Sequence, residues 1–152
     1  MKDLPDQTKA RKAWMGTLAK APEGRVQTLL DAEVARPGFV WLRQPEIGTV
    51  MVQGRAGGTG APFNLGEVTV TRCTLQLDSG EIGHAYLQGR RKRCAEAAAL
   101  VDALMQTVLA PDVMAKVVTP LEQELTDAKR NRAEKAAATK VDFFTMARGE
   151  DA

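Results

Sequence analysis

A glycine-rich stretch is the first feature of this sequence whose residue types could bind an anion. It reads Gly54-Arg55-Ala56-Gly57-Gly58-Thr59-Gly60-Ala61-Pro62 and follows a run typical of a strand. Successive glycine amides can point at a phosphate. The stretch lacks the Gly-Lys-Ser/Thr ending of a Walker loop. It is not a Rossmann fingerprint either, because we expect a strand after it, whereas that fingerprint is followed by a helix. Two interpretations stay open: a wide connection that needs several residues at positive φ, or an amide surface for a phosphate or a partner's backbone. For the second interpretation the candidate binding residues are Arg55, Gly57, Gly58, Thr59 and Gly60.

A run of cations is the second such feature. Arg90, Arg91, Lys92 and Arg93 follow Gly89, where the pattern predicts that a helix begins. Positive charge at a helix N-terminus is unfavourable by about 0.3–1 kcal/mol for each exposed group. Glu96, four residues after Lys92, is the internal compensation that the sequence offers. Two interpretations of this run stay open. An external anion binds at Arg90 and the helix start, or the run is a solvated basic turn.

Other residues with reactive side chains are few. His84, the single histidine, is expected to share a strand face with Tyr86. A general base needs an orienting partner that the sequence does not reveal, so a structural histidine is the favoured interpretation, and a phosphate or partner contact is the other. The acidic residues that could join it are scattered along the chain: Glu67, Asp78, Glu81 and Asp102. We therefore predict no independent catalytic centre.

The cysteines predict neither a metal site nor a disulfide framework. Cys73 and Cys94 have no metal-type or redox-type spacing, and His84 alone cannot complete a tetrahedral shell. We expect both thiols to be reduced, as in a cytosolic protein.

The hydrophobic periodicity predicts an α+β fold, with one domain over residues 1–138 and an interaction tail over residues 139–152. Two N-terminal helices are expected, then a four-stranded antiparallel sheet, then C-terminal helices with an extended tail. Thr119 and Glu122 form a capping box for the last helix. The expected helices are 5–21, 22–35 (with Pro22 in its first turn), 91 to before Pro111, 111–118 and one from Thr119, and the expected strands are 39–42, 47–55, 66–77 and 81–88.

The apolar phase slips inside the longest expected strand. Val68 and Val70 are even-numbered, whereas Cys73, Leu75 and Leu77 are odd-numbered. A β-bulge near residues 71–72 would return both sets to one face, and a strand buried on both faces is the alternative.

The C-terminal region changes from polar to aromatic. Residues 129–135 are polar on every side of a helix, so we expect this arm to project into solvent or to cross to another subunit. The tail then offers apolar anchors that could fill a pocket of the same chain or of a partner. These anchors are Val141, Phe143, Phe144 and Met146.

Composition excludes several classes of protein. The chain has 152 residues, 44% of them hydrophobic and 26% charged, and a net charge of +2. These values are typical of a globular domain and do not suggest a general binder of nucleic acid or membranes. No apolar run approaches the ~20 residues that span a bilayer, and the first residues lack the apolar centre of a secretion signal. We expect a cytoplasmic protein.

Several blocks of the sequence together resemble the PhnG family, the G subunits of the bacterial carbon–phosphorus lyase core complex. The resemblance extends over nearly the whole chain, and the order and spacing of the blocks make it specific. The blocks are Arg11-Lys12-Ala13-Trp14-Met15, residues 55–60, residues 66–72, Gly83-His84-Ala85-Tyr86-Leu87-Gln88-Gly89-Arg90, residues 95–106 and Val141-Asp142-Phe143-Phe144-Thr145-Met146-Ala147-Arg148-Gly149.

The resemblance implies a role in organophosphonate catabolism. The family supports transfer of a phosphonate to the ribose C1 of ATP with release of adenine, and the main chemistry belongs to the I subunit. The implied partners are the H, I and J subunits, in a complex with two copies of each subunit, and the L subunit functionally. The implied cofactors lie outside this subunit: the complex uses ATP, and the J subunit carries an iron–sulfur cluster and uses S-adenosylmethionine. No activity is expected from this chain alone.

A small RNA-binding α+β module is the alternative function. A sheet with helices and a basic corner permits it. The expected strands offer few aromatic side chains for base stacking, mainly Phe39, Trp41 and Tyr86.

Overall fold

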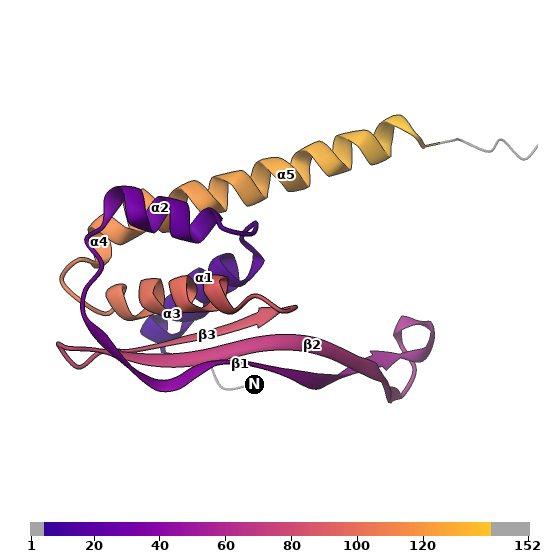
Figure 1. The fold of residues 1–152 in the computed structure, drawn as a ribbon. Coiled ribbons are helices and arrows are strands. Elements are labelled where there is room, and N and C mark those ends of the chain that lie inside the picture. Colours follow the sequence, from indigo (N-terminus) through magenta and orange to yellow (C-terminus); the bar gives the residue numbers. More distant parts are fainter. Residues whose placement is uncertain (1–4, 141–152) are drawn as a thin grey trace, which may run out of the picture.

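Helices cover one face of a three-stranded antiparallel sheet whose strand order is β1-β2-β3 (Figure 1). The computed structural model describes residues 5–140. Its elements in chain order are α1 (Asp6–Lys20), α2 (Arg25–Glu33), β1 (Phe39–Arg55), the 3₁₀ turn η1 (Ala56–Gly58), β2 (Pro62–Leu77), β3 (Ile82–Gln88), α3 (Lys92–Leu104), α4 (Ala110–Val113), the π-helical turn η2 (Met114–Val118) and α5 (Thr119–Ala138). The α+β class is confirmed.

The sheet has three described strands, where the sequence predicted four. The expected strands 39–42 and 47–55 are one strand, β1. Pro45 lies within it, which is tolerated because β1 is an edge strand and need not donate on its outer side. The β1–β2 register shifts between Trp41 and Arg43 and again between Arg43 and Glu46, so the irregular middle bends the strand without ending it.

The bulge expected near residues 71–72 is wrong. The β2–β3 register is unbroken from Val70 to Gln76, and Thr71 and Arg72 have consecutive partners on β1. Val70 is 4% exposed and Thr71 is 0% exposed. Because adjacent strand residues point to opposite faces, β2 is buried on both faces here, which is the alternative that the sequence left open.

The core lies between the sheet and α3. Alternate residues of β2 and β3 point toward α3, which presents a run of alanines and Leu100 and Leu104. Gly83 of β3 has no room for a side chain: an added Cβ would overlap the carbonyl oxygen of Ala99 and lie 2.9 Å from Cβ of Ala103. Small residues on both elements therefore set how closely α3 approaches β3.

Several helix boundaries differ from the expected ones. Helix α2 begins at Arg25, after Pro22, because Gly24 adopts a left-handed conformation with φ of 74° at the N-cap. Helix α3 ends at Leu104, well before Pro111. The capping box at Thr119 is wrong, because the chain is already helical through α4 and η2 and Thr119 continues that path without a side-chain cap.

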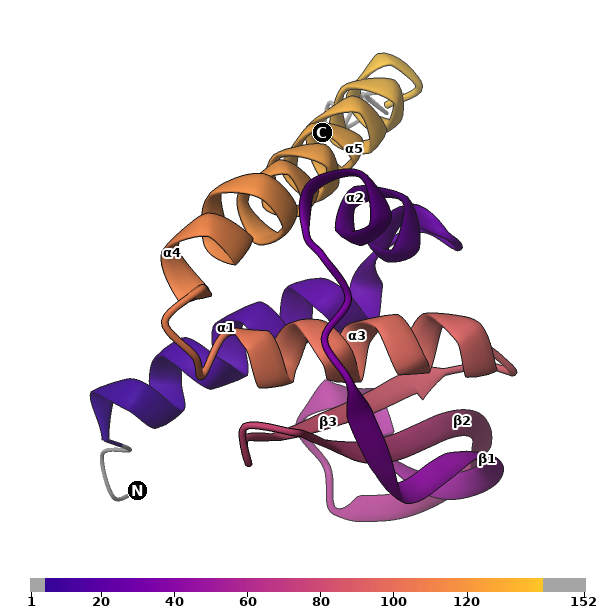
Figure 2. The same cartoon turned by 60° about the vertical axis from the view of Figure 1, so that its left-hand side comes forward.

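Two segments project from the body. Strand β3 pairs with β2 over Val70 to Gln76, so the outer half of the β1–β2 hairpin extends past α1, α2 and α3 as a two-stranded arm (Figure 1). Helix α5 projects from the helical layer toward the same side as the arm (Figure 1 and Figure 2), and residues 128–140 are all exposed. Within this chain the helix thus projects from the body, as both alternatives of the sequence analysis require, whether it ends in solvent or crosses to another subunit. No helix within residues 5–140 combines the length and the apolar character needed to span a bilayer.

Candidate functional site

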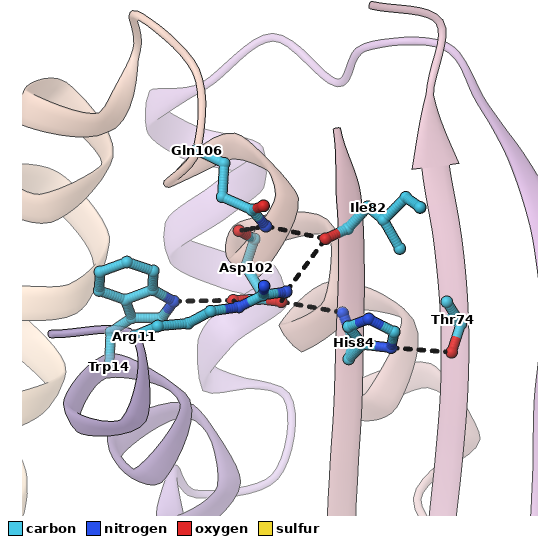
Figure 3. Close-up of polar contacts among 7 residues, drawn as sticks. All are labelled: Arg11, Trp14, Thr74, Ile82, His84, Asp102 and Gln106. Carbon is cyan, nitrogen blue, oxygen red and sulfur yellow. Dashed lines mark hydrogen bonds and ion pairs between the residues drawn. The ribbon is translucent and has the colours of Figure 1, made fainter. Parts of the chain in front are cut away.

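The densest polar cluster surrounds a fully buried carboxylate, Asp102 of α3, which is 0% exposed. Arg11 donates from Nε to Oδ1 at 3.1 Å and from Nη2 to Oδ2 at 2.7 Å. Trp14 donates from Nε1 to Oδ1 at 2.8 Å, and the backbone N–H of His84 donates to Oδ2 at 2.9 Å (Figure 3). A buried carboxylate is tolerated because four donors and one guanidinium charge satisfy it.

The same cluster covers the outer edge of β3. Since β3 pairs with β2 on one side, its other side presents backbone groups that need partners. Arg11 Nη2 donates to the carbonyl oxygen of Ile82 at 3.1 Å, and Gln106 Nε2 donates to that oxygen at 2.8 Å and to the carbonyl oxygen of Asp102 at 2.9 Å (Figure 3). Together with the Asp102–His84 contact, these bonds fix α1 and α3 against the edge of the sheet.

The Asp102 cluster is therefore a structural junction. Both carboxylate oxygens accept two hydrogen bonds each, so neither is left free to accept a proton from a substrate. The junction joins three elements that lie far apart in the sequence: α1, β3 and α3.

From the sequence alone, Asp102 is one of several scattered acidic residues. The available signal was an acidic residue within the apolar run from Ala97 to Leu104. A charge on a buried helix face must have a partner, but spacing alone does not identify Arg11 and Trp14 as the partners of Asp102.

His84 has a side-chain partner on the other face of the sheet. Its Nδ1 lies 3.1 Å from Oγ1 of Thr74, the residue opposite it on β2. His84 and Tyr86 alternate with the buried residues of β3, so they share the exposed face as predicted. The imidazole is thus oriented but open to solvent.

The glycine-rich stretch forms the tip of the β1–β2 arm. Gly57 and Gly58 adopt φ of 60° and 80°, so the predicted connection with residues at positive φ is confirmed. The N–H of Gly60 donates to the carbonyl oxygen of Ala56 at 2.9 Å, and Arg55 Nη1 donates to the carbonyl oxygen of Gly60 at 3.1 Å. The loop residues thus bind one another. Figure 1 places this tip at the far end of the arm from the β2–β3 connection.

The cation run is only partly free for a ligand. Arg91 Nη2 donates to the carbonyl oxygen of Ala21 at 2.8 Å, at the C-cap of α1, where a positive charge is favourable. Glu96 pairs with Arg36 at 3.7 Å, not with Lys92 as the spacing indicated. Arg90 is exposed. The structure brings Arg90 to the start of α3 but does not bring it together with the glycine-rich tip.

The two thiols are buried and unpaired. Burial raises the pKa of Cys73 to about 12, so this thiol stays neutral and unreactive near neutral pH. Within residues 5–140 no group of three or more His, Cys, Asp or Glu side chains is placed to hold a metal ion.

The proposed tail anchors lie outside the described residues. They are Val141, Phe143, Phe144 and Met146. Their role as partner contacts therefore stays a prediction.

Comparison with known proteins shows similarity to one family over most of the chain. The family described as "Phosphonate metabolism protein PhnG" matches residues 9–149. A protein of Rhizobium meliloti (strain 1021), named "Alpha-D-ribose 1-methylphosphonate 5-triphosphate synthase subunit PhnG", is 44% identical over 141 residues, which cover 93% of this chain and 90% of that protein.

Proposed function

This chain belongs to the PhnG family of phosphonate metabolism proteins, and from that membership we propose that it is a non-autonomous subunit of a ribose 1-methylphosphonate 5-triphosphate synthase. The observation that carries the proposal is the 44% identity over 93% of the chain to a protein with that name. The match extends over the body and the projecting helix alike, so the role concerns the whole chain.

The proposed role is assembly within the carbon–phosphorus lyase core complex. The complex transfers a phosphonate to the ribose C1 of ATP and releases adenine, and the main chemistry belongs to the I subunit. The most buried carboxylate of the described residues, Asp102, already accepts four hydrogen bonds within the fold. This saturation supports a structural rather than a reactive role for the cluster.

The proposed partners are the H, I and J subunits, with two copies of each subunit, and the L subunit functionally. ATP is used by the complex, and the iron–sulfur cluster and S-adenosylmethionine belong to the J subunit. The site of action is the cytoplasm. The two projecting segments support an assembly role, because the β1–β2 arm exposes Met51 (49%), Phe63 (46%) and Leu65 (67%), and apolar side chains of this size are typical of obligate interfaces.

Co-expression with the H, I and J chains tests the proposal. We expect a purified particle whose mass corresponds to two copies of each chain, measured by native mass spectrometry. A chain that never joins the other three, under conditions where those three are folded, would contradict the proposal.

The tail is the proposed anchor for the I subunit. Replacing Phe143 and Phe144 by Ala should weaken association by several kcal/mol, because buried aromatic anchors carry much of an interface's energy. Val108→Ala is the control, since Val108 is 94% exposed and lies on the body. Normal co-purification of the Phe143/Phe144 variant would show that the tail is not an anchor.

A weaker proposal places a triphosphate-bearing ligand near Arg90, His84 or the glycine-rich tip (Arg55, Gly57, Gly58, Thr59 and Gly60). The exposure of Arg90 at the start of α3 supports it. Arg90→Ala should reduce the affinity of the assembled complex for a non-hydrolysable ATP analogue, measured by calorimetry. An unchanged affinity would remove Arg90 from the site.

An RNA-binding function has no support in the described fold. Phe39 and Trp41 pack edge to face, with ring centroids 5.0 Å apart, against the core beneath the helices. Of the three aromatic residues considered for base stacking, Tyr86 is the one on the open face of the sheet. A single ring is a poor platform for successive bases.

A further inference from the structure

A groove between α1 and α5 has a concentration of positive charge that the fold itself does not use. Its volume is about 870 Å³. The cations along it come from both helices, and Glu122 is the single acidic residue among those that line it. The cationic residues are Lys9, Lys12, Lys20, Lys129 and Arg132.

These cations are mostly without carboxylate partners. Lys9 forms an exposed pair with Asp6 at 3.4 Å, and Glu122 accepts a hydrogen bond from Thr17 Oγ1 at 3.4 Å. The other four cations form no ion pair with any residue in the range 5–140. Like charges three residues apart on a helix, as Lys129 and Arg132 are, destabilise it by about 0.2–0.5 kcal/mol for each pair. The fold therefore keeps this charge at a cost, and an external anion would compensate it.

The groove is also lined by small and apolar residues. They are Ala13 and Gly16 of α1 and Leu125 of α5. A Cβ added at Gly16 would meet nothing within 4 Å, so the glycine is not required by packing within the chain. It leaves room for a side chain from elsewhere.

The arrangement of the charges selects the kind of ligand. Lys9 and Lys20 are 11 residues apart on α1, which corresponds to about 16 Å along the helix axis. The groove runs along the flanks of two helices, and its lining includes neither a helix N-terminus nor a glycine-rich loop, the usual cradles of a compact phosphate. Cations spread along a groove that is also lined by apolar residues fit an extended, acidic and amphipathic ligand.

We propose that the α1–α5 groove is the docking site for an acidic amphipathic helix of another chain of the synthase. The apolar face of that helix lies on Ala13, Gly16 and Leu125, and its carboxylates face the lysines on the two rims. This inference rests on the proposed function, because it assumes that the chain works inside a multi-subunit complex.

The charge of the groove is tested by Lys12→Glu together with Lys129→Glu in the co-expressed complex. We expect the association rate constant at low salt to fall by about tenfold or more, because rim charges mainly steer association. The matched control is Lys92→Glu with Lys116→Glu, which changes the net charge equally and lies on the body outside the groove. Equal rates for the two double variants would overturn the groove as a docking site while leaving the subunit role intact.

The shape of the groove is tested at Gly16. Gly16→Leu places a side chain into the open space and should reduce co-purification of the partner chains, whereas Gly16→Ala should not. Both variants should melt no lower than the wild type, since alanine and leucine are better helix formers than glycine. Undiminished co-purification of Gly16→Leu would also overturn the proposal.

The occupant is identified by a photo-cross-linker. Thr126 lines the groove and is exposed, so p-benzoylphenylalanine at this position should cross-link to whatever lies there in the assembled complex. An acidic helical peptide from a different chain supports the proposal. A peptide from this chain's own tail, from a second copy of it, from a segment without acidic residues, or no cross-link at all would overturn it. If the wild-type chain forms no complex, the proposed function itself fails.

Discussion

Asp102 shows how a single buried charge can organise three distant elements. Arg11 and Trp14 approach it from α1 and the backbone of His84 approaches it from β3. The carboxylate is fully buried while the Arg11 side chain is 33% exposed, so the loss of the carboxylate charge leaves a guanidinium in a partly desolvated position.

Asp102→Asn should destabilise the fold by about 2–4 kcal/mol, somewhat below the range for breaking a fully buried pair because Arg11 is partly solvated. An amide has one acceptor oxygen and brings two N–H donors toward the donors of Arg11. Urea denaturation measures the change in the free energy of unfolding. Glu46→Gln, which removes the exposed partner of Arg72, is the control and should cost less than about 1 kcal/mol. Equal losses in the two variants would contradict the assigned role.

The buried thiol of Cys73 should make the stability of the fold depend on pH under alkaline conditions. Burial raises its pKa in the folded chain to about 12 from an ordinary value of 9.0. The folded state therefore holds the thiol proton more tightly than the unfolded state does. The resulting contribution to the free energy of unfolding is fully present below about pH 9 and is lost as the pH rises toward 12. The stability of the wild type should fall more steeply than that of Cys73→Ala between these values, measured by urea denaturation at a series of pH values. Parallel slopes would show that the thiol does not contribute.

At the scale of elements, the contact between α3 and β3 depends on the absence of side-chain atoms. Gly83 faces the backbone of Ala99 and the methyl group of Ala103. Interiors are packed closely enough that one added methyl group forces a shift of backbone.

Gly83→Ala should destabilise the chain by about 1–3 kcal/mol or more, because α3 must move away from the sheet. Gly48→Ala is the matched control, since Gly48 is also a strand glycine and an added Cβ there meets nothing within 4 Å. Thermal unfolding of the two variants measures the difference, and a melting temperature for Gly83→Ala at or above that of the control would contradict the packing argument.

The sequence predicted the α+β class and the position of most elements, because periodicity is local information. It predicted two strands where β1 is one, because Pro45 interrupts a central strand but not an edge strand, and edge position is a tertiary property. It also missed the partners of Asp102, because Arg11 lies 91 residues away in the chain. Spacing cannot reveal contacts that depend on how α1 lies across α3.

The glycine-rich tip and the cation run show the same limit. Positive φ at Gly57 and Gly58 was predictable from residue type alone. The contact of Arg91 with the end of α1 was not, because it needs the packing of two helices. The spacing on one helix predicted an ion pair between Glu96 and Lys92. In the structure Glu96 pairs instead with Arg36, which lies in another segment.

At the scale of the whole molecule, the β1–β2 arm exposes large apolar side chains and is therefore a second candidate surface for the proposed assembly. Phe63 and Leu65 near its tip are 46% and 67% exposed. Side chains of this kind gain little from the fold of the isolated chain, and their burial by a neighbour would stabilise a complex by about 1.5–3 kcal/mol for each fully covered side chain.

Replacing Phe63 and Leu65 by Ser should leave the melting temperature of the isolated chain within a few degrees of the wild type and reduce the yield of the co-purified complex. The reason is that these side chains face solvent before assembly and apolar surface after it. Analytical gel filtration of co-expressed chains measures the yield. Val40→Ser, at a position that is 56% exposed on the part of β1 nearest the helices, is the comparison, and an equal loss of complex there would show that the arm tip has no special role.

The projecting end of α5 has a consequence for the supply of this protein in a cell. Residues 128–138 of α5 are exposed throughout, and a helical stretch of this length is only marginally stable in water unless it packs against other elements. In the proposed assembly, copies outside the complex would present this lysine- and arginine-rich segment to proteases, whereas assembled copies would be shielded. Degradation of orphan copies would then match the amount of this subunit to the amount of its neighbours, without any dedicated regulator.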